Sequence, residues 1–219
     1  MILPRGLIVS CQARADNPLH GPQFMAAMAR AARDAGAVGI RADGPADIAA
    51  IRAAVDLPIV GIHKVFAEGQ DVYITPTVDA ARAVIAAGAR VVAFDATDRP
   101  RAGDAPADIV AAIHAEGAES FADVATLAEG LAAAALGVTY VSTTLSGYTA
   151  ATRGTGPGPD LDLVAALAAR AGVPVVAEGR YNTPELARAA LAAGARAVVV
   201  GTAITNPREI ARGFVRALG

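Results

Sequence analysis

One sequence pattern recurs along this chain: an alanine-rich segment, a turn containing glycine, and a short run of β-branched residues. It can be followed at 32–42, 85–96, 135–144, 169–179 and 191–203. Glycine suits the left-handed residue that ends many helices. A nearly continuous apolar run is typical of a strand covered on both faces. The repeat therefore predicts helices that alternate with buried parallel strands.

Extending the pattern outward gives eight strand–helix units. The strands are expected at 6–10, 38–42, 58–64, 91–96, 119–124, 138–143, 174–179 and 197–202. The helices are expected at about 22–35, 45–55, 78–87, 105–115, 126–136, 160–171, 183–193 and 206–218. Strict alternation over eight strands favours a closed parallel barrel. We therefore expect an α/β protein, a single (β/α)8 TIM barrel of the phosphate-binding type, that occupies residues 1–219 as one domain.

Composition narrows the class of protein. The net charge is −2, and no basic stripe is interleaved with aromatic residues, so we expect no nucleic-acid partner. No apolar run is long enough to cross a bilayer, and the first residues do not read as a signal peptide. Cys11 is the sole cysteine, which fits a reducing compartment. These features predict a soluble cytoplasmic protein.

Polar residues stand where most of the expected strands end. The set is Cys11-Gln12, Arg41, Lys64, Asp95, Asp123, Thr143-Thr144, Glu178-Gly179-Arg180 and Gly201-Thr202. In barrels of this kind, ligand sites are built from the loops at the C-terminal ends of the strands. A convergence of so many polar residues on that face predicts the site there.

Lys64 and Glu178 are the candidate catalytic residues in this set. Alternation places Lys64 on the strand face of Val60 and Ile62. If that face points inward, burial and a cation such as Arg41 would favour a neutral amine that can take a proton. Glu178 ends the seventh strand, which lies opposite the third, so a substrate over the axis would meet both groups. The alternatives are a solvated lysine, and a glutamate paired with Arg41 or Arg180.

The last two units carry the signals of a phosphate site. Gly179 and Gly201 allow backbone N–H groups to approach an anion, and Arg180 or Thr202 can add donors. Barrels frequently bind phosphate at these two loops. The three histidines are scattered, so no metal is expected.

Two stretches break the alternation. Residues 65–77 contain VYIT, an expected short extra strand. Residues 146–159 are rich in Gly, Pro and Thr and are expected to form a mobile loop or lid. Both follow strand ends, on the face where the site is predicted.

Several of these segments resemble one known family. GLIVSCQ (6–12), PIVGIHK (58–64), DATDRPR (95–101), STTLSGYT (142–149) and AEGRYNTPE (177–185), with AGAVGIRADG and VGTAIT, are similar to the N-acylglucosamine-6-phosphate 2-epimerases. The resemblance covers nearly the whole chain. It implies a cofactor-free enzyme of sialic-acid and aminosugar catabolism that converts N-acetylmannosamine 6-phosphate to N-acetylglucosamine 6-phosphate. It also implies that Lys64 is the acid/base, that Glu178 assists it, and that Gln12, Arg41 and Asp123 hold the substrate.

One position departs from that family. The resemblance implies an arginine after AIT, where this chain has Asn206, and Arg208 stands two residues further on. The alternatives are a Schiff-base aldolase or lyase that uses Lys64, and a non-catalytic sugar-phosphate binder. A metal-dependent pentose-phosphate epimerase is disfavoured because clustered ligands are missing. The alanine-rich outer helices and the last helix are a candidate seam for a homodimer.

Overall fold

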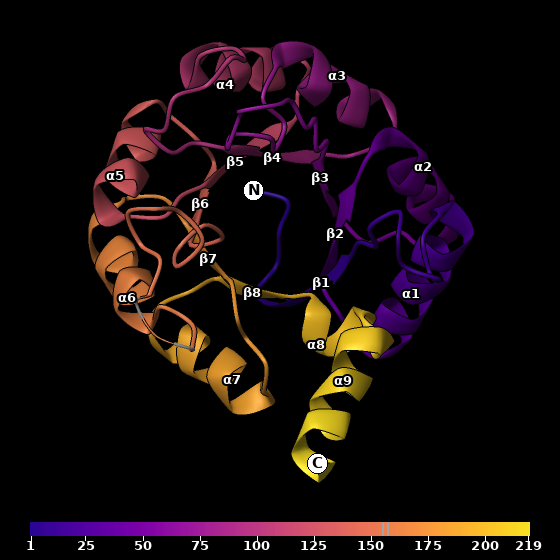
Figure 1. Ribbon diagram of the computed structural model, residues 1–219. Coiled ribbons are helices and arrows are strands. Elements are labelled where there is room, and N and C mark those ends of the chain that lie inside the picture. The colour runs from indigo at the N-terminus through magenta and orange to yellow at the C-terminus, as the bar shows by residue number, and fades with distance from the viewer. Residues whose placement is uncertain (155, 157) are drawn as a thin grey trace.

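The computed structural model describes residues 1–154, 156 and 158–219, which form a closed barrel of eight parallel strands in sequence order (Figure 1). The strands are β1 (Gly6–Cys11), β2 (Gly39–Asp43), β3 (Ile59–Ile62), β4 (Val91–Asp95), β5 (Glu119–Asp123), β6 (Tyr140–Ser142), β7 (Val175–Glu178) and β8 (Ala197–Val200). The helices are α1 (Pro22–Asp34), α2 (Pro45–Ala54), α3 (Val78–Ala86), α4 (Pro106–Ala115), α5 (Leu127–Ala135), α6 (Leu161–Arg170), α7 (Pro184–Ala192), α8 (Thr202–Thr205) and α9 (Pro207–Leu218). The expected (β/α)8 barrel is confirmed.

Alternation along the strands divides the apolar residues between two layers. One cluster fills the barrel interior and includes Ile8, Val60, Ile62, Phe121 and Val199. The other lies between the outer face of the strands and the helices. Val60 and Ile62 belong to the interior cluster, so the strand face that they share with Lys64 points into the barrel. This is the orientation that a role of Lys64 in the site requires.

The N-terminal segment closes one end of the barrel. The buried Leu3 donates its backbone N–H to Tyr140 Oη at 3.1 Å and accepts from Arg196 Nε at 2.7 Å. The backbone N–H of Ile2 donates to a carboxylate oxygen of Glu119, the first residue of β5, at 2.8 Å. Figure 1 shows this segment at the centre of the ring. The end at which the strands begin is therefore filled, and the opposite end is left for a ligand.

Every strand stops within two residues of its expected end, and the largest differences are at β3 and β8. Strand β3 stops at Ile62, and Lys64 instead forms an isolated antiparallel bridge with Ile74, which is all that remains of the extra strand expected in VYIT. Strand β8 stops at Val200, and Thr202 begins the short helix α8, which was not predicted. The backbone amides of Ile204 and Thr205 both donate to the carbonyl of Gly201, at 2.8 and 2.9 Å. These local hydrogen bonds replace the ladder bonds that a longer strand would need.

The loop expected at 146–159 is only partly described, since Thr155 and Pro157 lie outside the described residues. Its first part is held by short-range hydrogen bonds. Gly147 N donates to Thr152 Oγ1 at 2.9 Å, and Ser146 Oγ donates to Asp160 Oδ2 at 2.6 Å. That this segment moves as a lid stays a prediction.

Helix α9 differs from the other long helices because it does not pack on the barrel. None of its residues is buried, and Phe214 and Leu218 are 70% and 88% exposed. Figure 1 shows it running outward from the ring between α7 and α1. Within the described chain, no helix is both long and apolar enough to cross a membrane.

Candidate active site at the strand ends

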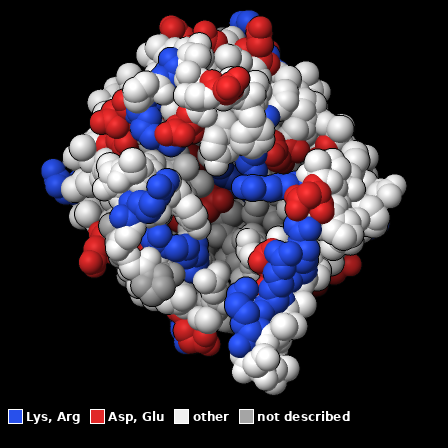
Figure 2. All heavy atoms as spheres, viewed as in Figure 1, with Lys and Arg blue, Asp and Glu red and all other residues white. Residues whose placement is uncertain are grey.

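A cavity of about 570 Å³ opens at the C-terminal ends of the strands. Figure 2 shows it as a hollow at the centre of this face, with lysine and arginine side chains on its rim. Eight of the residues predicted for the site line it: Gln12, Arg41, Lys64, Glu178, Gly179, Arg180, Gly201 and Thr202. The ninth, Asp123, is fully buried beside Arg41 and does not line the cavity.

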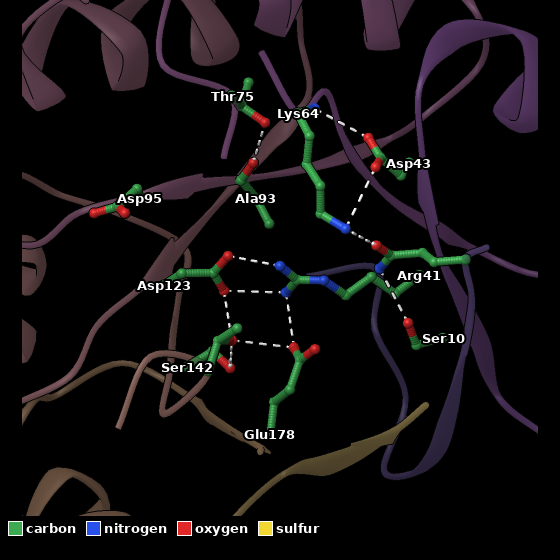
Figure 3. Close-up of polar contacts among 12 residues, drawn as sticks. Ser10, Arg41, Asp43, Lys64, Thr75, Ala93, Asp95, Asp123, Ser142 and Glu178 are labelled. Carbon is green, nitrogen blue, oxygen red and sulfur yellow. Dashed lines mark hydrogen bonds and ion pairs between the residues drawn. The ribbon is translucent and has the colours of Figure 1, made fainter. Parts of the chain in front are cut away.

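Arg41 is the centre of the polar network at the bottom of this cavity. Its guanidinium donates to both oxygens of Asp123, at 3.0 and 2.6 Å, and to Glu178 Oε2 at 2.8 Å (Figure 3). The Arg41 side chain is only 1% exposed. Burial works against its charge, but the two carboxylates outweigh that effect and raise the pKa of Arg41 above its ordinary value. The ion pair between Glu178 and Arg41, which the sequence left open as an alternative, is therefore present.

Glu178 titrates differently from an ordinary glutamate. Burial raises the pKa of its carboxyl to about 7, with Arg41 opposing the shift and Asp123 adding to it. Thr144 Oγ1 lies 2.6 Å from Asp123 Oδ1 and 3.0 Å from Glu178 Oε2. One hydroxyl proton can serve only one of these two acceptors at a time, and when it is donated to Glu178 it lowers the pKa of that carboxyl, against the effect of burial. Near neutral pH the group can therefore either give or take a proton.

Lys64 reaches the cavity from the other side, because β3 lies opposite β7 in the closed barrel. Its Nζ donates to Gln12 Oε1 at 2.5 Å and lies 3.4 Å from Asp43 Oδ2. Its backbone N–H donates to Asp43 Oδ1 at 3.0 Å. Asp43 therefore contacts both the backbone N–H and the side-chain amine of Lys64. The charge next to the amine is this carboxylate, and not Arg41 as the sequence suggested, because Asp123 and Glu178 hold the guanidinium.

Thr75 fixes the turn that carries Lys64. Its backbone has a φ of 44°, unusual for a β-branched residue. Its hydroxyl accepts from the backbone N–H of His63 at 3.1 Å and donates to the carbonyl of Ala93 at 2.6 Å. These bonds tie the loop after β3 to β4, so Lys64 leaves the barrel wall in a defined direction.

Sequence reasoning assigned no role to Arg14, Asp43 or Thr144, which the structure places at the cavity or beside its predicted residues. Asp43 stands two residues after Arg41, so strand alternation would place both on one face, but the expected strand ended at 42. Thr144 was in the strand-end set, although no role was assigned to it. Arg14 carries no signal in the sequence, because it lies in an irregular loop after β1.

Four residues of the strand-end set do not line the cavity: Asp123 beside Arg41, Thr143, Cys11 and Asp95. Cys11 belongs to the outer apolar cluster, and burial raises the pKa of its thiol to about 12. Asp95 binds its own loop, through Thr97 Oγ1 at 2.6 Å and Arg99 Nη2 at 2.5 Å. Both side chains therefore serve packing and loop structure.

A closed parallel barrel whose mouth joins an amine, a guanidinium and titratable carboxyls has the architecture of an α/β-barrel enzyme. The family model described as "Putative N-acetylmannosamine-6-phosphate epimerase" matches residues 25–219. The chain belongs to this family, which confirms the resemblance seen in the sequence.

Individual relatives agree with this assignment. The chain is 48% identical over 216 residues to a protein of Caldanaerobacter subterraneus subsp. tengcongensis, covering 97% of this chain and 91% of the relative. It is 45% identical over 215 residues to one of Shouchella clausii, covering 97% and 95%. Both bear the name "Putative N-acetylmannosamine-6-phosphate 2-epimerase". The solved N-acetylmannosamine-6-phosphate 2-epimerase of Clostridium perfringens superimposes with a TM-score of 0.95 at 42% identity, over 99% of this chain and 94% of that one.

Proposed function

We propose that this protein interconverts N-acetylmannosamine 6-phosphate and N-acetylglucosamine 6-phosphate in aminosugar and sialic-acid catabolism, without a cofactor, by removing and returning the proton at C2. One observation carries the proposal. The same cavity receives the Lys64 amine from one side and, from the opposite strand, the Glu178 carboxyl with its pKa of about 7. Inversion of a carbon centre requires proton transfer at both of its faces.

The chemistry begins from the open-chain sugar, in which C2 is bonded to the C1 aldehyde. The amine form of Lys64 takes the C2 proton, and the electron pair moves onto O1 as an enolate. Arg41 Nε is buried and has no hydrogen-bond partner among the described residues, and Gln12 Nε2 donates only to Ser10 Oγ at 3.0 Å. Both can donate to the ligand, which is where the developing negative charge needs stabilisation.

The proton then returns to the opposite face of C2 and the aldehyde re-forms. Two donors are compatible with this site: the neutral carboxyl of Glu178, or the Lys64 ammonium with substrate groups relaying the proton. The variant Glu178→Gln distinguishes them. If Glu178 is the donor, the variant still exchanges the C2 proton in deuterated water but forms no epimer.

The decisive experiment follows N-acetylmannosamine 6-phosphate by proton NMR in deuterated water. Wild-type protein is expected to form the epimer, whereas Lys64→Ala should lower both C2 exchange and turnover by about 10³-fold while it unfolds like the wild type. Wild-type exchange in Lys64→Ala would exclude Lys64 as the base. A borohydride-stable adduct at Lys64 would indicate Schiff-base chemistry instead, and ligand binding without turnover would indicate a binding protein.

The predicted homodimer is also part of this proposal. An apolar cavity of about 450 Å³ lies between α7, β1, β8 and α8, lined among others by Leu7, Ala187, Leu191 and Ile204. Helix α9 carries exposed apolar residues, and it runs outward on the other side of the gap that separates it from α7 in the helical ring (Figure 1). Exposed apolar patches of this kind mark protein interfaces, and a second copy supplies a matching surface by symmetry. A cytoplasmic location and the lack of a nucleic-acid partner stay predictions.

A further inference from the structure

The rim of the active-site cavity near β1 and β7 carries two arginines that have no carboxylate of a described residue within 4.0 Å. Arg14 and Arg180 both line the cavity. Of the ion pairs formed by the described residues, none includes either side chain. By contrast, Arg41 and Lys64 lie within 4.0 Å of carboxylates. The net positive charge of the cavity is therefore concentrated at this rim, away from the proton-transfer groups.

The backbone conformation and the side-chain contacts of Arg180 fix it at the rim of the cavity. Its backbone has a φ of 61°, in the left-handed region that a side chain normally avoids, and it follows Gly179 at a φ of 106°. Its guanidinium lies over the Tyr148 ring, 5.7 Å from the centroid. Its Nη1 lies against the backbone of Gly147, at the place that a Cβ on residue 147 would occupy. Arg180 Nε is buried, and no described residue accepts from it. Strain that fixes an unpaired donor at a cavity indicates a ligand.

Asn206 lines the same cavity but its side chain is engaged elsewhere. Its Oδ1 accepts from the backbone N–H of Glu209 at 3.3 Å, which caps α9, and from Asn17 Nδ2 at 3.4 Å. Arg208 is held by Asp16, through Oδ2 and the backbone carbonyl, both at 3.0 Å. Arg208 is therefore not the replacement for the arginine that the family resemblance implies at position 206.

These contacts also fix the loop that carries Arg14. Asn17 and Asp16 connect the β1–α1 loop to the start of α9, and Asn17 N donates to the carbonyl of Arg14 at 2.9 Å. Asp16 interacts electrostatically with Arg14, while its carboxylate forms its ion pair with Arg208. The loop thus holds Arg14 at the rim with its guanidinium available.

We propose that Arg14 binds the 6-phosphate together with Arg180, and so supplies the positive charge that this chain lacks at position 206. This inference rests on the proposed function, which provides the sugar phosphate. A guanidinium presents planar paired donors that match phosphate oxygens. Because Arg14 lies at the rim and not beside Lys64, it acts on substrate binding and leaves the proton transfer unaffected.

The test compares Arg14→Gln with the matched control Arg30→Gln, which removes an equal charge from the exposed face of α1. Calorimetry measures the Kd of N-acetylglucosamine 6-phosphate, with unphosphorylated N-acetylglucosamine as the second probe. Arg14→Gln is expected to raise the Kd of the phosphorylated sugar and the KM by about tenfold, as loss of one charge-assisted hydrogen bond implies. It should leave kcat within about twofold, and Arg30→Gln should change neither constant.

A second pair of variants examines position 206. Asn206→Ala should leave the Kd within about twofold, because its side chain caps a helix. Adding Asn206→Arg to Arg14→Gln should recover most of the lost affinity. A wild-type Kd in Arg14→Gln, or a tenfold loss in Arg30→Gln as well, would overturn the role of Arg14. A wild-type protein that does not bind the phosphorylated sugar would overturn the proposed function too, so the two failures are distinguishable.

Discussion

Asp123 accepts two parallel hydrogen bonds from Arg41 across the barrel, at 3.0 and 2.6 Å, and neither side chain is more than 1% exposed. A buried pair with this geometry tolerates the loss of a partner badly, because the remaining charge loses a counter-ion in a place that water does not reach. Without Asp123, Arg41 would keep one carboxyl group, that of Glu178, in place of two. The Arg41–Asp123 ion pair therefore stabilises the polar network at the bottom of the active-site cavity.

Asp123→Ala should therefore destabilise the protein by about 3–5 kcal/mol, the usual cost of breaking a buried ion pair. Urea denaturation monitored by circular dichroism measures the free energy of unfolding. Removing an exposed pair is the control: Arg52→Ala, which separates Arg52 from Asp56 at 3.9 Å, should have almost no effect. Equal losses in the two variants would contradict this account.

Glu178 should make stability depend on pH in a defined direction. Between its ordinary pKa of 4.5 and its folded pKa of about 7, the unfolded chain releases the proton while the folded chain keeps it. The contribution of this group therefore falls as pH rises through that window. Glu178→Gln has no such proton, so its free energy of unfolding should rise relative to the wild type between pH 5 and pH 8. A difference that is independent of pH, or falls, would exclude the raised pKa.

Asp43 is expected to position Lys64 without touching the reacting carbon. Asp43→Asn keeps an oxygen for the backbone N–H of Lys64 but removes the charge that lies 3.4 Å from Nζ. We expect kcat to fall about ten- to a hundredfold, because small errors in the placement of a catalytic group are costly. KM should stay within about twofold, and so should the unfolding midpoint. A change confined to KM would instead assign Asp43 to substrate binding.

The apolar face of α9 should control the oligomeric state. Wild-type protein is expected to elute from size exclusion with light scattering at twice the mass of one 21.9 kDa chain. Phe214→Glu combined with Leu218→Glu should give monomers, since charges cannot be buried unpaired in an interface. Leu136→Glu, an exposed leucine after α5, is the matched control and should leave the dimer intact. A monomeric wild type would refute the interface.

How far the sequence predicts this protein can be judged from particular residues. The period of the strands and the glycines after the helices place the eight units, because both signals are local. Alternation assigns Lys64 to the inward face of its strand, and barrel topology sets Glu178 opposite it. The sequence is therefore sufficient to predict both as site residues. Arg14 and Asp43 were not predicted, since a loop residue and a strand-end residue acquire neighbours only when distant segments meet. The short helix α8 was not predicted, because the same residues could also extend strand β8. No local sequence pattern distinguishes the helical hydrogen bonds from those of a longer strand.

The sequence by itself determined the barrel, the face on which the site lies and the family, since these depend on periodic patterns and on motifs that can be read along the chain. The tertiary structure decided which charges meet. It paired Arg41 with Asp123 and Glu178, and placed Asp43 beside Lys64. It also engaged the side chains of Asn206 and Arg208 with the β1–α1 loop. The physical reason is distance: electrostatic interactions and desolvation depend on separations of a few ångströms between side chains that lie far apart in the sequence.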